Sequence, residues 1–284
     1  MEQKMRKLFQ FNVLFMSFVL MMFVGSFSYA QDAVPGTPNE QATQEKPATK
    51  TLPEGLTANL NTTFYSKYVW RGLELSKDSL VIFPSLTIGY KGFALNVWVD
   101  LDTNFDNPPP GEKSKANLQE TDLTLTYTNK IKPLKMHYTL GWIYYDTDGF
   151  YGDTPTSNQE VFVTLAFDVL LKPTLSVYTE IETGEAWYVS LALAHSFKIY
   201  KDWSLDVGGW VSYLDNKAED FSALHDGNLW MGLAIPLSSY FSVTPKIQYS
   251  FPLSSDSDDR IEANSFNGKD SNFLYGGLIF DLKF

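Results

Sequence analysis

The chain ends in the twelve residues FLYGGLIFDLKF, from Phe273 to Phe284, and this stretch decides the fold. Apolar residues occupy every second position from Leu274 onward, with Gly276 as the only gap, and the positions between them include Asp281 and Lys283. Successive side chains of a β-strand point to opposite faces. A period of two therefore predicts a final strand with one apolar and one more polar face.

The same period of two recurs through most of the chain after residue 55. Apolar and polar residues alternate from Phe93 to Asp102, for example, and again from Leu205 to Tyr213. No later segment has a sustained helical period, and no internal run has the about 20 apolar residues that a transmembrane helix needs. The alternation predicts about twelve strands, at residues 57–70, 78–91, 93–103, 118–129, 134–146, 158–171, 174–183, 186–198, 203–214, 226–236, 240–251 and 271–284.

The segments between these strands alternate in length. Short segments such as 91–92 follow the even-numbered strands, and longer polar ones such as 104–117 mostly follow the odd-numbered strands. A soluble sandwich gives no reason for this asymmetry, whereas an outer-membrane barrel has short periplasmic turns, longer outside loops and an even number of strands. Closure would also satisfy the backbone hydrogen bonds in hydrocarbon. The predicted fold class is therefore all-β: an antiparallel transmembrane β-barrel of about twelve strands.

The N-terminus predicts export. Lys4, Arg6 and Lys7 form a positive segment, an apolar run follows, and Ser28-Tyr29-Ala30 gives a small-x-small cleavage pattern. The residues after it are rich in Pro, Thr, Gln and Glu and cannot bury a core. We expect an outer-membrane protein of a Gram-negative bacterium, with a cleaved signal peptide at 1–30, a short disordered periplasmic linker at 31–54 and the barrel at 55–284.

Composition and the C-terminal residues limit the classes of partner that the protein is expected to bind. The chain has no cysteine, which excludes disulfides and cysteine-ligated metals, and its net charge of −11 argues against nucleic acid as a partner. A final strand that ends in phenylalanine, with apolar residues at alternate positions, resembles the signal by which outer-membrane barrels reach their assembly machinery. We therefore expect this machinery and outer-membrane lipid as partners, with an assembly signal formed by Phe280, Leu282 and Phe284.

The stretch SKYVWRGLELS, from Ser66 to Ser76, lies where the first predicted strand reaches the outer rim. Continuing the parity of that strand places Tyr68 and Trp70 on the lipid side, in an aromatic girdle at the membrane boundary. Lys67 and Arg71 then point into the lumen, and Gly72 begins the first outside loop. Arg71 is expected to pair with Asp100 or Asp102, or to orient an anionic solute group. The other residues assigned to the girdle are Trp142, Trp187 and Tyr213.

The inward positions of the strands collect a polar set in which acids outnumber bases. A barrel of twelve strands encloses more room than the roughly eight strands that side chains just fill. The lumen is therefore either a salt-bridged polar core or a narrow, weakly cation-preferring channel for the passive diffusion of small solutes or ions. Besides Lys67 and Arg71, the pore-lining candidates are Asn96, Asp100, Asp102, Glu120, Asp122, Glu180, Glu182, Asp206 and Lys246.

The pattern Ser66-x-Tyr68-x-x-Arg71-Gly72, followed by Ser76, resembles the S-x-Y-x-x-R-G-x-x-x-S signature near the start of TorF-type porin-like proteins. These are exported bacterial outer-membrane proteins of largely unknown function. Later segments, such as Gly141-Trp142-Ile143-Tyr144-Tyr145, resemble the family more loosely. The resemblance spans residues 56–284 and implies a membrane channel with an unassigned substrate and no catalytic residue.

Two other classes of function stay open. A lipid hydrolase would need an activated serine beside a histidine. His137 is expected to face the lumen and His225 to lie at a loop–strand junction, whereas His195 faces lipid but lies toward the periplasmic end, and no hydrolase motif surrounds it. A surface or binding barrel without an open pore would act through its outer loops. The acidic run from Asp256 to Glu262 lacks the glycine and the ligand spacing of an EF-hand, which predicts a solvated loop. The sequence thus predicts a non-enzymatic barrel with no metal site and no cofactor.

Overall fold

The computed structural model describes residues 54–76, 79–104, 116–148, 156–182 and 184–284. The predicted signal peptide and all but the last residue of the predicted linker lie outside these residues. Within the described ranges, no helix has the length and apolar character needed to cross a membrane.

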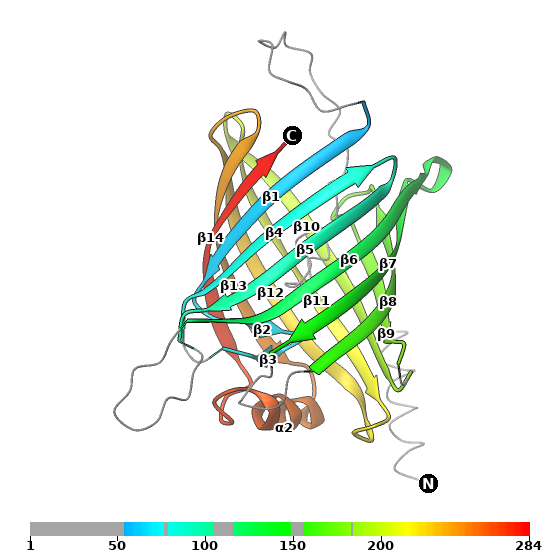
Figure 1. Cartoon of the computed structure of the whole chain (residues 1–284), viewed down its shortest axis with the longest axis vertical. Coiled ribbons are helices and arrows are strands. Elements are labelled where there is room, and N and C mark those ends of the chain that lie inside the picture. Colours follow the sequence, from blue (N-terminus) through cyan, green and yellow to red (C-terminus); the bar gives the residue numbers. More distant parts are fainter. Residues whose placement is uncertain (1–53, 77–78, 105–115, 149–155, 183) are drawn as a thin grey trace.

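Twelve antiparallel strands form a closed barrel (Figure 1), which confirms the predicted fold class and strand number. β1 and β14 pair to close the sheet, with Thr62 opposite Phe280. Closure pairs both edges of the sheet, and so removes the unpaired backbone groups that a membrane cannot accept. The barrel strands are β1 (Leu56–Tyr65), β4 (Val81–Tyr90), β5 (Phe93–Asp102), β6 (Asn117–Ile131), β7 (Met136–Thr147), β8 (Thr156–Phe167), β9 (Thr174–Glu180), β10 (Ala186–Tyr200), β11 (Trp203–Asn216), β12 (Phe221–Pro236), β13 (Phe241–Pro252) and β14 (Phe273–Lys283).

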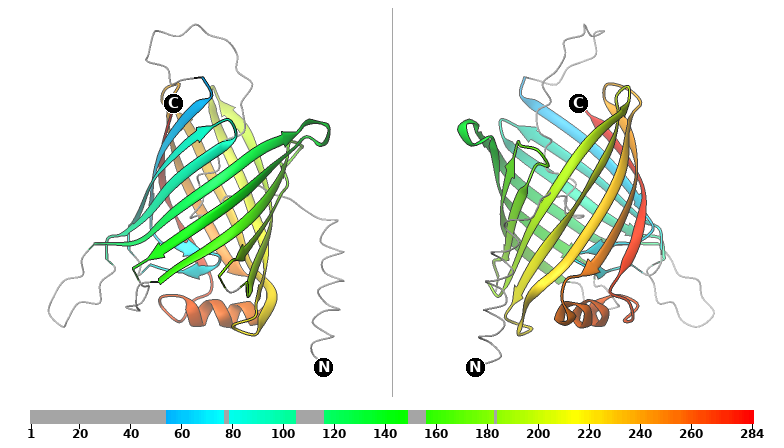
Figure 2. Two further views of the ribbon diagram at one scale, coloured as in Figure 1. Left: turned by 45° about the vertical axis from the view of Figure 1, so that its right-hand side comes forward. Right: turned by 180° about the vertical axis from the view of Figure 1, so that it is seen from behind.

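The two ends of the barrel carry different connections (Figure 2). Short turns join β4 to β5, β6 to β7, β8 to β9, β10 to β11 and β12 to β13 at the end where β14 finishes. We call this end the turn end and the opposite end the loop end. In the first of these turns, Lys91 and Gly92 both have positive φ, as a two-residue hairpin turn requires. In outer-membrane barrels the short turns face the periplasm, so the loop end faces outward.

Alternate side chains of each strand face the two sides of the barrel wall. Leu274 of β14 and Phe284, directly after this strand, are 62% and 64% exposed, whereas Tyr275 is buried. On β4, Leu86 is exposed and its neighbour Thr87 is buried. The outer surface is therefore an apolar belt around a more polar interior, which is the arrangement that a lipid environment demands.

A hairpin inside the barrel departs from the predicted pattern. The first strand ends at Tyr65 rather than near residue 70, and the chain then forms two short paired strands, β2 (Val69–Trp70) and β3 (Leu73–Glu74). We call residues 66–76 the inward hairpin. Its turn residues Arg71 and Gly72 have φ values of 46° and 84°, which match a two-residue turn. Gly72 therefore belongs to this turn, and its assignment to the first outside loop is wrong.

A short helix, α2 (Ser255–Asn264), lies at the loop end and contacts β3, β12 and β13 (Figures 1 and 2). The prediction of a loop in this segment is wrong, although Asp256, Asp259 and Glu262 are exposed, as predicted for a solvated acidic run. Ser254 caps the helix by accepting a hydrogen bond from the Ser257 N–H, and Ile261 is its one buried apolar residue. Ile261 and Ala263 are the only apolar residues among its ten and are spaced two apart, which gives no helical period, so the sequence pattern could not indicate this helix.

Candidate functional site

The inward hairpin lies in a packed core at the loop end of the barrel interior. Tyr68 and Leu75 of the hairpin are buried together with the wall residues Phe83 and Trp98, and Ile261 of α2 belongs to the same cluster. The Phe83 and Trp98 rings stack with 5.0 Å between centroids, and the Tyr68 ring meets Phe83 edge-on at 5.2 Å. The hairpin is therefore a packed part of the barrel interior.

Tyr68 and Trp70 do not belong to an aromatic girdle, and that prediction is wrong for both. Tyr68 is 1% exposed, and its hydroxyl donates to Oε2 of Glu120 at 2.8 Å. Trp70 packs edge-on against Tyr145, which is itself buried in the interior. The parity of β1 does not extend past Tyr65, because the chain leaves the wall there. The interior then supplies the acceptor that a buried phenol needs.

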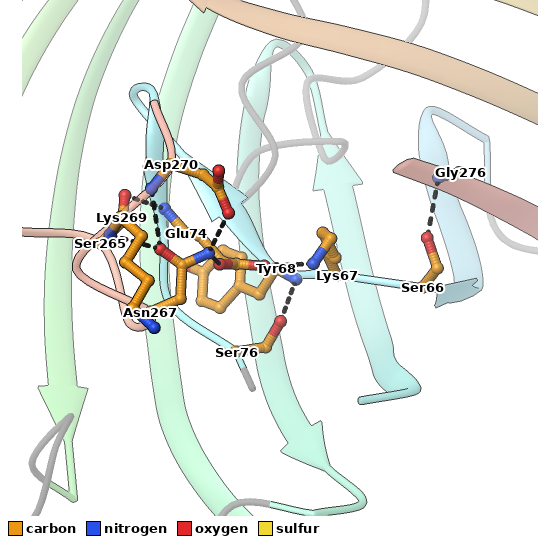
Figure 3. Close-up of polar contacts among 10 residues, drawn as sticks. All are labelled: Ser66, Lys67, Tyr68, Glu74, Ser76, Ser265, Asn267, Lys269, Asp270 and Gly276. Atoms are coloured by element: carbon orange, nitrogen blue, oxygen red, sulfur yellow. Dashed lines mark hydrogen bonds and ion pairs between the residues drawn. The ribbon is translucent and has the colours of Figure 1, made fainter. Parts of the chain in front are cut away.

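Polar contacts fix the base of the inward hairpin (Figure 3). The Lys67 ammonium lies 2.5 Å from Oε1 of Glu74, and the backbone N–H of Tyr68 donates to Oγ of Ser76 at 2.7 Å. Asn267, which follows α2, donates to Oε2 of Glu74 at 3.0 Å. The base is therefore tied to itself and to the segment after α2.

Arg71 holds the tip of the inward hairpin. Its guanidinium makes two hydrogen bonds to the carboxylate of Glu160 on β8, at 2.7 and 2.6 Å. Its Cζ lies 4.5 Å from the ring centroid of Trp70, 5.0 Å from that of Tyr178 and 4.5 Å from that of Tyr188. These distances are within the range of cation–π attraction, so one cation meets a bidentate carboxylate and three aromatic rings.

The backbone of the tip is fixed as well. Nε2 of His225 lies 2.9 Å from the carbonyl oxygen of Arg71, and a carbonyl only accepts, so this nitrogen donates. A Cβ at Gly72 would lie 2.8 Å from Cδ1 of Ile261 and 3.0 Å from Cβ of Asp226. The turn therefore requires glycine for space as well as for its positive φ.

Four acidic residues form a buried carboxylate cluster on the inner wall: Asp100 and Asp102 of β5, and Glu120 and Asp122 of β6. Arg71 does not contact this cluster. Asp100 lies opposite Glu120 in the sheet, and each member is at most 5% exposed. The expected pairing of Arg71 with Asp100 or Asp102 is wrong, because the hairpin carries Arg71 to β8 instead. Among the described residues, no group of three or more histidine and acidic side chains is placed to hold a metal ion.

The turn-end half of the interior contains a cavity of about 880 Å³. Its wall includes threonines of several strands, together with Asp206, Trp230 and Lys246. The Lys246 ammonium lies 4.8 Å from the ring centroid of Trp230. We call this space the turn-end cavity; most of the residues around it are small polar or charged residues.

Two ion pairs line the turn-end cavity. Lys130 contacts Asp168, and Nε2 of His137 lies 3.1 Å from the same carboxylate. Hydrogen bonding from Lys130 holds the pKa of Asp168, in the turn after β8, below its ordinary value. Nζ of Lys283 lies 2.7 Å from Oδ2 of Asp281. These pairs lie at an open end of the barrel and are more exposed than those of the inward hairpin.

The remaining pore-lining candidates lie in three different environments. Asn96 is buried and donates to Oγ1 of Thr87 at 2.9 Å. Glu180 is half-buried and lies opposite Glu160 in the sheet. Glu182 is exposed and accepts a hydrogen bond from Gln159 at 3.2 Å. Its assignment to the lumen is wrong, because β9 ends at Glu180 and the parity stops there.

The other aromatic candidates lie on the outer side of the wall. Trp187 is 43% exposed, and its neighbour Tyr188 faces the interior. Trp142 and Tyr213 are partly exposed next to buried residues, and Nε1 of Trp142 donates to Gln159. Their role as a girdle stays a prediction. The same holds for the assembly role of the outward residues Phe280, Leu282 and Phe284.

His225 lies near a serine, but the pair is not arranged as a hydrolase site. Nδ1 of His225 is 3.4 Å from Oγ of Ser257, and that hydroxyl donates at 2.7 Å to the carbonyl of Leu224. Both side chains are at most 1% exposed. A nucleophile must reach its substrate and give its proton to the base. This pair does neither, and His225 instead positions the hairpin tip.

The residues that receive Arg71 were not predicted from the sequence. They are Glu160, Tyr178 and Tyr188, and each occupies an inward position on its strand. Glu160 directly precedes the alternating run that starts at Val161, so counting one residue further back would have found an inward acid. No sequence pattern shows that Arg71 crosses the interior to meet it.

Comparison with protein-family models and with curated proteins finds no match to the sequence. Solved structures do match. The NanC porin is 10% identical with a TM-score of 0.47, over 80% of this chain and 98% of that one. An outer membrane channel from Pseudomonas putida F1 gives the same identity and score, over 85% of this chain and 100% of that one. At such scores the likeness supports neither a solute nor a partner for this chain, and the TorF-type resemblance stays a prediction. The closed twelve-stranded barrel with its apolar outer belt is an outer-membrane β-barrel.

Proposed function

We propose that this chain is an outer-membrane channel for the passive diffusion of small polar solutes or ions, and that the inward hairpin closes it at the loop end. The observation that carries the proposal is the turn-end cavity of about 880 Å³ within a closed barrel. A barrel that only anchors loops would gain stability by filling its interior with side chains. Here one half is packed and the other is hollow.

The carboxylate cluster favours cations over anions as the permeating charge. Asp100, Asp102, Glu120 and Asp122 lie on the inner wall beside the hairpin, where a solute would pass once the hairpin withdrew. Rings of acidic side chains lower the barrier for cations in narrow pores. The lysines of the turn-end cavity oppose this effect, so the preference for cations is weak.

A second candidate is a surface or structural barrel whose interior never opens. The packing of Tyr68, Leu75 and Ile261 into one buried cluster favours this alternative. The two functions differ in whether the inward hairpin ever leaves this cluster.

Planar-bilayer recording of the refolded barrel tests the proposal. We expect small, discrete conductance steps and reversal potentials that favour cations weakly in a salt gradient. Absence of conductance across a wide voltage range, with the barrel shown to be folded and inserted, would contradict a channel. A reversal potential that favours anions would contradict the role given to the carboxylate cluster.

A further inference from the structure

The wall residues around Arg71 are arranged like a binding site for a guanidinium group. Glu160 presents both oxygens to the guanidinium, at 2.7 and 2.6 Å, and Tyr145 donates its hydroxyl to Oε2 of Glu160 at 3.0 Å. Tyr178 and Tyr188 place their rings 5.0 and 4.5 Å from Cζ of Arg71. These four residues belong to the barrel wall, so the site does not depend on the hairpin for its carboxylate.

The geometry fits a guanidinium better than other cations. A planar guanidinium offers two parallel N–H donors to a carboxylate and a flat face to aromatic rings, whereas an ammonium is a compact point charge. Both contacts are present here at once: the bidentate pair with Glu160 and the rings of Tyr178 and Tyr188.

The site also favours a cation when Arg71 is absent. The Glu160 side chain is 6% exposed in the closed barrel and lies among Tyr145, Tyr178 and Tyr188. A buried carboxylate left without its partner is strongly destabilising. Withdrawal of the inward hairpin removes Arg71 from Glu160. Another cation that binds Glu160 in its place lowers the free energy needed for this withdrawal.

We propose that Glu160, Tyr145, Tyr178 and Tyr188 form a guanidinium-binding site that Arg71 occupies in the closed barrel, and that guanidinium-bearing solutes compete with Arg71 for it. Arg71 is then a ligand supplied by the chain itself, and a solute that displaces it favours release of the hairpin. The existence of the site does not depend on the channel. The consequence that displacement opens a pore rests on the proposed function.

Arg260 provides a matched comparison within the same chain. It also makes two hydrogen bonds to one carboxylate, that of Glu219 at 2.6 and 2.8 Å, and its Cζ lies 5.3 Å from the ring centroid of Phe221. The Glu219 side chain is 42% exposed, so water can solvate it when Arg260 is removed. With the rest of the hairpin in place, removal of the arginine leaves a buried carboxylate at Glu160 and a partly exposed one at Glu219, so a replacement cation should stabilise the first far more than the second.

Chemical rescue of the Arg71→Ala barrel by methylguanidinium tests the site directly. Hydrogen exchange of residues 66–76 and the thermal midpoint are measured with increasing methylguanidinium, well below denaturing concentrations, and with methylammonium as the control cation. We expect exchange to slow several-fold and the midpoint to rise with methylguanidinium only. Arg260→Ala and the double variant Arg71→Ala, Glu160→Gln should show no such rescue. Equal responses of Arg71→Ala and the double variant, or equal effects of both cations, would overturn the proposal.

Competition in the unmodified barrel gives a second test that needs no folded variant. An alkylguanidinium should accelerate exchange of the inward hairpin several-fold, while an alkylammonium of the same length should not. Equal effects of the two cations, or none, would overturn the proposal. Conductance recorded with the same compounds separates the two ideas: faster exchange without higher conductance supports the site and contradicts the channel.

Discussion

The two halves of the barrel interior differ in how far side chains fill them. At the loop end, the inward hairpin and α2 pack with the wall, and the ion pairs Arg71–Glu160 and Lys67–Glu74 are largely buried. At the turn end, the cavity stays hollow, and the pair Lys130–Asp168 is 41% and 33% exposed. The same wall therefore surrounds a packed core at one end and an open space at the other.

This difference indicates which contacts hold the barrel closed. Removing one partner of a buried ion pair costs about 3 to 5 kcal/mol, because the other charge stays buried and unpaired. An exposed pair contributes about 0 to 1 kcal/mol, because water replaces the lost partner. Breaking a buried pair of the inward hairpin should therefore lower the free energy of unfolding far more than breaking an exposed pair.

The largest effect is expected for Arg71→Ala. It leaves the carboxylate of Glu160 buried among aromatic rings, so the closed state should lose about 3 to 5 kcal/mol. Arg260→Ala removes an arginine with a similar bidentate pair at an exposed carboxylate and should cost at most about 1 kcal/mol. Thermal unfolding in detergent compares the two variants. Similar losses in both would show that burial does not set the strength of these pairs.

A smaller effect is expected for Tyr68→Phe. The substitution keeps the packed ring but removes the hydroxyl that donates to Glu120 at 2.8 Å. A buried acceptor left without its donor costs about 1 to 3 kcal/mol. Tyr213→Phe is the matched control, since that hydroxyl contacts Ser222 on the outer side. Hydrogen exchange of the inward hairpin should accelerate in Tyr68→Phe alone, and unchanged exchange would argue against a role for this bond.

The smallest effect is expected for the exposed pair of the turn end, and it depends on pH. The pKa of Asp168 is lowered from its ordinary value near 3.8, first by the hydrogen bond from Lys130. The pair therefore contributes stability above this ordinary value and loses it as the pH falls through the lowered pKa. Lys130→Ala should cost less than about 1 kcal/mol at pH 7. The thermal midpoints of the two proteins should converge in acid, and a difference that grows in acid would contradict this assignment.

The sequence predicts the barrel wall well because the wall obeys one local rule. Alternation along the chain decides which side chains meet lipid, and the asymmetry of the connections decides which end faces outward. The inward hairpin breaks this rule, because Tyr68 and Trp70 keep an apolar parity after the chain has left the wall. The Arg71-Gly72 pair between Trp70 and Leu73 was the local signal of a tight turn. Its position across the interior depends on contacts with Glu160 and His225, which are far away in the sequence.

The conductance of a barrel with a shortened inward hairpin tests the account most directly. Residues 67–75 are replaced by a short Gly-Ser linker, and single-channel recordings are compared with those of the unmodified barrel. If the hairpin closes the loop end of a channel, the shortened barrel should conduct in steps several-fold larger and should stay open longer. A folded, inserted variant whose conductance equals that of the unmodified barrel would contradict the account.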